Sequence, residues 1–134
     1  MSEAHDVAAL GYPLVYRNLM AVGLLGAVYR VRDEAETVSS AVELTLADPT
    51  SFRVCRAIAQ GIGGDAQYAS DTLGRHVDEH PDDEGAKVAL ATAFLLARDE
   101  RWKPILDQVL ATSADPNVRE AANGIKDYAA TLQQ

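Results

Sequence analysis

The chain has 134 residues, enough for one domain with a modest core and too few for two comfortable ones. Hydrophobic residues make up 48% of it but aromatic residues only 6%, and alanine is conspicuous, which suits close helix packing better than a β-sandwich. Twenty acidic against twelve basic side chains give a formal net charge of −8, which argues against binding to a nucleic-acid backbone or to an anionic membrane.

The start of the chain is polar and acidic, and we expect residues 1–10 to form a flexible leader rather than a signal peptide. The most apolar run, Leu19 to Val28, is too short to span a bilayer. The single cysteine, Cys55, cannot form a disulfide within the chain. We therefore expect a cytoplasmic protein without membrane insertion, with residues 11–134 forming a single domain.

Apolar residues recur at spacings of three and four through most of the chain, and we find no sustained alternation of the kind that marks strands. This pattern predicts an all-α protein with seven helices. They run from Pro13 to about Arg30, over about 33–47, from Thr50 or Ser51 to the glycines at 61–64, and over about 65–80, 83–97, 100–112 and 117–132.

Prolines that stop helices divide these elements into similar units. Pro49, Pro81 and Pro116 are spaced by 32 and 35 residues, close to the roughly 34 residues of a tetratricopeptide repeat. Gly63 and Gly64 permit a turn with positive φ before Asp65, which can cap the next helix. We therefore predict three degenerate tetratricopeptide-like helical hairpins followed by a C-terminal capping helix.

In a stack of such hairpins, the first helix of each pair lines a concave groove. With Asn18, Thr50 and Glu84 taken as first positions, the groove residues are largely aliphatic. Those on which we place partner binding are Leu19, Val22, Val54, Ile58, Ile62, Val88, Thr92, Leu95 and Leu96.

An exposed apolar groove is an aggregation hazard, so an occupant is expected. One candidate is an amphipathic helix of another protein, laid in the groove through residues at i, i+3, i+4 and i+7. Two others are a second copy of the chain, which would make a homodimer, and the chain's own last helix.

Three groups of residues invite an enzymatic interpretation. His76 and His80 lie one helical turn apart among acidic residues, but the helix dipole explains histidines at a helix end more simply than a metal does. Glycines 61, 63 and 64 follow a helix rather than a strand and lack the lysine of a phosphate loop. Cys55 lies in an apolar pattern typical of a structural thiol. We expect no catalytic set, no cofactor and no metal, and hence a protein that is not an enzyme.

The second half of the chain resembles a known family. The residues that carry the resemblance are Asp99 to Trp102, Leu106, Leu110, the run Ser113-Ala114-Asp115-Pro116, and the run from Ala121 to Ile125. Together with the helix spacing from about Ala35 to Leu132, they are similar to the small tetratricopeptide-like proteins of bacterial type III secretion. These include the needle-subunit chaperones of animal pathogens and the related Hrp-type secretion protein of plant-associated bacteria.

The resemblance implies a cytoplasmic chaperone that holds a helix of a small filament-forming subunit and so prevents its premature assembly. It also implies a second small helical co-chaperone, for which the apolar stretch from Leu19 to Leu25 is the candidate contact. The Hrp-type relatives suggest an alternative, a structural component of the secretion apparatus that associates with itself through the groove.

Overall fold

The structure is a computed structural model that describes residues 14–29 and 32–132. The predicted leader, residues 1–10, and the predicted start of the first helix at Pro13 lie outside the described residues. Within them the chain forms seven helices and no strands, so the all-α prediction is confirmed. The helices are α2 (Leu14–Val28), α3 (Arg32–Thr45), α4 (Thr50–Ile62), α5 (Gln67–Glu79), α6 (Glu84–Leu96), α7 (Trp102–Thr112) and α8 (Pro116–Leu132).

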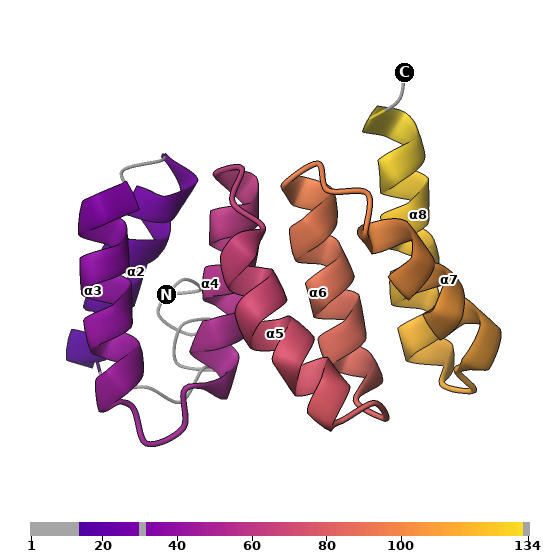
Figure 1. Ribbon diagram of the computed structural model, residues 1–134, viewed down its shortest axis with the longest axis horizontal. Coiled ribbons are helices and arrows are strands. Elements are labelled where there is room, and N and C mark those ends of the chain that lie inside the picture. Colours follow the sequence, from indigo (N-terminus) through magenta and orange to yellow (C-terminus); the bar gives the residue numbers. More distant parts are fainter. Residues whose placement is uncertain (1–13, 30–31, 133–134) are drawn as a thin grey trace.

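The helices stand in a row of hairpins, from α2 and α3 at one end to α7 and α8 at the other (Figure 1). The even-numbered helices pack on one another in sequence, α2 on α4, α4 on α6, and α6 on α8. The odd-numbered helices α3, α5 and α7 form the other layer, which lies in front in Figure 1. This order is that of a helical repeat with an additional C-terminal helix.

The second and third hairpins repeat local geometry at a period of 34 residues. Helices α4 and α6 begin at Thr50 and Glu84. Each ends in a Schellman motif, in which the residue after the C-cap has positive φ: Gly64 at 92° and Arg98 at 61°. The period predicted from the prolines is therefore present in the helix ends themselves.

Aspartates, rather than hydroxyl residues, begin the helices. The predicted cap of α4 by Thr50 or Ser51 is wrong, because the Asp48 carboxylate accepts hydrogen bonds from the Thr50 amide at 3.1 Å and from its hydroxyl at 2.7 Å. Asp65 accepts from the amide two residues later, as Asp99 and Asp115 also do. Asp83 accepts from the amide three residues later. A carboxylate at this position also interacts favourably with the helix dipole.

The hydrophobic core is continuous only from α4 to α8. Its largest cluster contains Leu90, Phe94, Trp102, Leu106 and Val109 with small residues around them. The first hairpin joins it through two smaller clusters, one around Met20, Val42 and Phe52 and the other of three alanines, Ala27, Ala35 and Ala59. The first hairpin is thus attached by less apolar contact than the others.

Two glycines let α4 approach its neighbours closely. A β-carbon on Gly61 would lie 2.6 Å from the carbonyl oxygen of Ala93 in α6. One on Gly63 would lie 2.2 Å from the carbonyl oxygen of Ala27 in α2. Gly63 has φ of −73°, so its role is this close approach and not the positive φ predicted for the Gly63-Gly64 pair, which only Gly64 adopts.

We predict that Gly61→Ala destabilises the protein by about 1–3 kcal/mol, because α4 and α6 must separate to accommodate the methyl group. The matched control is Gly124→Ala in α8, where no atom lies within 4 Å of the added carbon. That variant should stabilise the protein by about 0.5–1 kcal/mol, since alanine is the better helix former. Urea unfolding measures both changes. Equal effects at the two sites would contradict the close-packing argument.

The aspartate caps predict a loss of stability in acid. Hydrogen bonds from Thr50, His76 and Arg101 are the main reasons why the pKa values of Asp48, Asp83 and Asp99, respectively, lie below the ordinary 3.8. A carboxyl whose folded pKa is lowered stabilises the fold above its unfolded pKa, and this contribution disappears as the pH falls through the folded value.

Accordingly, Asp83→Ala should cost about 1 kcal/mol at neutral pH, and the difference from the parent protein should shrink below about pH 4. The control is Asp82→Ala at the neighbouring exposed position, which should change little at either pH. Urea unfolding at a series of pH values tests this, and a difference that persists undiminished in strong acid would refute it.

Candidate functional site

Exposed large apolar side chains gather on the even-numbered helices. Among the described residues they are Leu19, Val22 and Leu25 in α2, Tyr29 just after it, Ile62 in α4, and Tyr128 and Leu132 in α8, whereas the odd-numbered helices expose only Leu44. We refer to the first seven as the even-helix apolar residues. Their distribution agrees in part with the predicted groove, which was placed on the first helix of each hairpin.

The nine predicted groove residues differ in their exposure. Leu19, Val22 and Ile62 are exposed, and Val54, Ile58, Val88, Thr92 and Leu96 are half-buried. Leu95 is only 6% exposed and belongs to the core cluster, so the structure corrects its placement on the binding surface. The physical reason is that α6 lies between two even-numbered helices, and α8 packs against it.

The half-buried members of the predicted set also serve the fold. Val54 and Val88 pack against the core cluster, and the Thr92 hydroxyl donates to the carbonyl of Val88 at 2.8 Å. Helix α8 packs on α6 and α7 but leaves Val22 and Ile62 exposed, so it does not cover the predicted groove along its length.

The cavities of the molecule lie elsewhere. Three have volumes of about 380, 300 and 280 Å³, and Val54 is the one predicted groove residue that lines any of them. The largest lies between α3 and α5, on the odd-numbered side of the row. Ile58 and Ile62 each follow a lining residue of that cavity, Arg56 and Gln60, by two positions, about 200° of helix rotation. The apolar side of α4 and the largest cavity therefore lie on opposite sides of the helix.

A polar network that sequence reasoning missed joins the first two hairpins. Arg56 in α4 is 4% exposed. Its guanidinium lies 3.6 Å from the Glu43 carboxylate of α3, hydrogen bonds to Ser40 at 3.3 Å, and stacks on the ring of Tyr68 in α5 at 4.2 Å. The Tyr68 hydroxyl donates to Glu43, and Arg53 lies 3.7 Å from the same carboxylate. Three helices therefore meet at one carboxylate.

The chemistry of this network keeps its groups inert. Burial, followed by the hydrogen bond and the charge of Glu43, raises the pKa of Tyr68 well above its ordinary value, so the phenol stays protonated. Burial also raises the pKa of the Cys55 thiol, which disfavours the nucleophilic thiolate. Neither side chain is set up for nucleophilic catalysis.

The two histidines near the end of α5 are tied to a helix cap. His76 Nε2 lies 2.8 Å from Asp83 Oδ2, and Asp83 also caps α6. The rings of His76 and His80 stack at 4.7 Å between centroids. No group of three or more His, Cys, Asp or Glu side chains within residues 14–29 and 32–132 is arranged to hold a metal ion.

We predict that Glu43→Gln destabilises the protein by about 1–3 kcal/mol, because it leaves the buried Arg56 charge without its carboxylate. Arg56→Met in the same chain should recover most of that loss, since an apolar side chain of similar length removes the unpaired charge. Urea unfolding of the two single variants and the double variant measures the coupling. Purely additive effects would argue against an energetic link between the two residues.

The search for relatives gave no name to this arrangement. No family model, curated protein or solved structure matches the chain. None of the helices in the described part of the chain is of the length and apolarity needed to traverse a bilayer.

Proposed function

We propose that this protein is a non-enzymatic helical-repeat binding protein that holds an amphipathic helix of a partner against its even-numbered helices. The observation that carries the proposal is the distribution of exposed apolar side chains, seven on the even-numbered side and one on the odd-numbered side of the described structure. Contiguous apolar surface on a protein commonly marks an interaction site.

The stripe along α2 has the spacing that a partner helix needs. Leu19, Val22, Leu25 and Tyr29 follow one another at three or four residues and therefore lie along one side of the helix. Ile58 and Ile62 form a similar pair on α4, which packs beside α2. A helix laid across both would bury its i, i+3, i+4 and i+7 residues against aliphatic side chains.

The proposed cellular role rests on the sequence resemblance stated above. We propose a chaperone or accessory protein of type III secretion, which covers the assembly surface of a small filament-forming subunit until export. Competitive burial is the mechanism: the apolar face with which a subunit packs on its neighbours is occupied while it is bound here. The exposed Leu19, Val22 and Leu25 suit either the subunit or a co-chaperone.

A second candidate is a self-associating component of the apparatus. Terminal helices of repeat proteins normally present a polar outer side, because nothing stacks on them. Here six of the seven even-helix apolar residues belong to the end helices α2 and α8 or to the turn after α2. This concentration at the ends favours contact between copies of the chain.

We predict that Ile62→Glu weakens binding of the partner helix by about 30-fold or more, the effect typical of a charge placed at an interface anchor. Because Ile62 is 48% exposed, its replacement should change the free energy of unfolding by less than about 0.5 kcal/mol. The matched control is Leu44→Glu in α3, where the side chain is 86% exposed on the other layer and partner binding should be unchanged.

The measurement is native mass spectrometry after co-expression with the genes beside its own. A 1:1 or 1:1:1 complex with a small helical subunit, lost in the Ile62 variant and retained in the Leu44 variant, supports the chaperone. A homodimer with no other protein bound, converted to monomer by Ile62→Glu, replaces it with the self-associating component. Equal loss in both variants would refute an interface on the even-numbered helices.

A further inference from the structure

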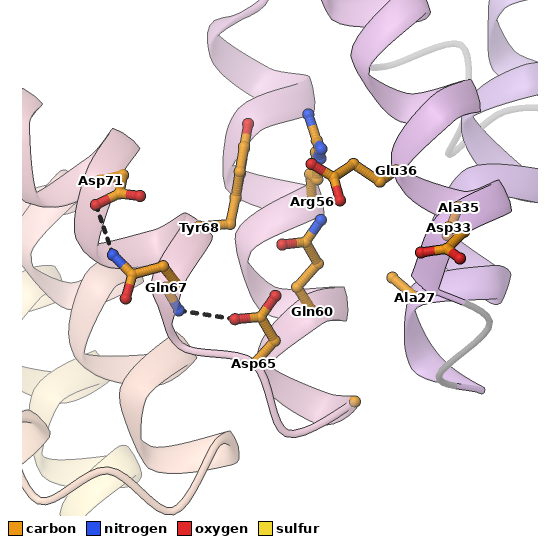
Figure 2. A pocket seen from close by; sticks show the side chains of 11 residues that line it. Ala27, Asp33, Ala35, Glu36, Arg56, Gln60, Asp65, Gln67, Tyr68 and Asp71 are labelled. Atoms are coloured by element: carbon orange, nitrogen blue, oxygen red, sulfur yellow. Dashed lines mark hydrogen bonds between the residues drawn. The ribbon is translucent and has the colours of Figure 1, made fainter.

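The largest cavity lies where the repeat is irregular. Helix α5 packs on α6 and α7 packs on α8, but α3 makes little contact with α4. The space left between α3 and α5, with α4 as its floor, is the cavity of about 380 Å³. Figure 2 shows Glu36 and Asp33 on the α3 side, Gln67, Tyr68 and Asp71 on the α5 side, and Arg56 and Gln60 between them.

The walls of this cavity carry an excess of negative charge. Asp33 and Glu36 line one side, and Asp65 and Asp71 line the other. Asp65 accepts from the Gln67 amide at 2.9 Å and Asp71 accepts from the Gln67 side chain at 2.8 Å, so neutral donors hold these two carboxylates in place. Within the described part of the chain, none of the four forms a salt bridge.

One cation lines the cavity, and it is incompletely paired. Arg56 directs its terminal nitrogens to Glu43 and Ser40, but its buried Nε has no hydrogen-bond partner. A buried N–H without an acceptor costs free energy, and native structures usually supply one. In Figure 2 the Arg56 side chain stands between Tyr68 and Glu36, with its stem beside Gln60. The cavity therefore combines four carboxylates in need of cations with one donor in need of an acceptor.

The chemistry of a suitable ligand follows from this combination. A single metal ion does not fit, because no three acidic or histidine side chains of the described residues are grouped to hold one. A free polyamine supplies cations but no acceptor for Arg56. A peptide with arginine or lysine supplies both, since its side chain carries the charge and its backbone carries carbonyl groups. The volume suits one long side chain with its peptide unit.

We propose that the cleft between α3 and α5 binds a basic peptide segment. Its guanidinium or ammonium group lies among Asp33, Glu36 and the α5-side carboxylates, and a backbone carbonyl accepts from Arg56 Nε. This site is on the side of α4 opposite Ile58 and Ile62, so it is separate from the surface assigned to an amphipathic helix and does not depend on that proposal.

The test is isothermal titration of the full chain with a blocked pentapeptide that alternates alanine and arginine, in low salt, where weak charge pairs are least screened. We expect a submillimolar Kd. The double variant Asp33→Asn with Glu36→Gln should weaken binding by about tenfold, the loss expected for two partly exposed charge pairs. The control is Glu34→Gln with Asp78→Asn, exposed carboxylates on the same two helices that do not line the cavity.

Three results would overturn the proposal. The first is no measurable binding of the peptide. The second is equal weakening in both double variants, which would show attraction to the net charge of the chain alone. The third is binding of spermidine as tight as that of the peptide, which would show that a carbonyl acceptor contributes nothing. Because the variants lie outside the core clusters, their thermal unfolding should match that of the parent chain.

Discussion

The close approach of α4 to the helices on either side of it is the constraint on which the rest of the structure depends. At Gly61 and Gly63 the backbone of α4 approaches the carbonyl groups of Ala93 and Ala27 so closely that no side chain fits between. Ala57 and Ala91, 34 residues apart, are completely buried nearby in sequence. Close backbone contact brings the even-numbered helices into one layer, and it leaves their larger aliphatic residues to be placed elsewhere.

That placement separates the chain into two surfaces of different character. On α4, small residues occupy the sides that face α2 and α6, Arg56 and Gln60 face the space under α3 and α5, and Ile58 and Ile62 lie opposite them. A helix with contacts on three sides can expose only the fourth. The apolar exposure at Ile62 is therefore a consequence of how α4 is packed, and a partner that buries it gains free energy without disturbing the stack.

The first hairpin is joined to the stack by charge where the others are joined by apolar packing. Arg56 occupies the position 34 residues before Leu90, which lies in the core cluster. Replacing a leucine by a guanidinium requires a carboxylate and a ring to accompany it, and Glu43 and Tyr68 meet that requirement. The bulk of these polar groups holds α3 away from α4 and α5, which produces the acidic cleft. One residue in the repeat thus accounts for both the polar network and the cavity.

The sequence allowed the helices to be placed within two residues of their ends, because proline, glycine and aspartate act locally on the backbone. Gly64 and Asp65 identify the first turn of this kind, whereas Arg98 adopts the same positive φ without a glycine and could be recognised only by its 34-residue offset. Which apolar residues would be exposed was less predictable. Leu95 and Ile62 fit the same repeat position rule, yet α6 has a covered neighbour at Leu95 that α4 replaces by Gly61. Arg56 gave a usable signal that was not used: it follows Phe52 by four residues and precedes Ala59 by three, and both are buried. A charge on a buried helical side implies a buried partner, so this spacing alone predicts an ion pair at the junction of the hairpins. Its identity depends on which helix lies opposite, and that is a property of the tertiary packing.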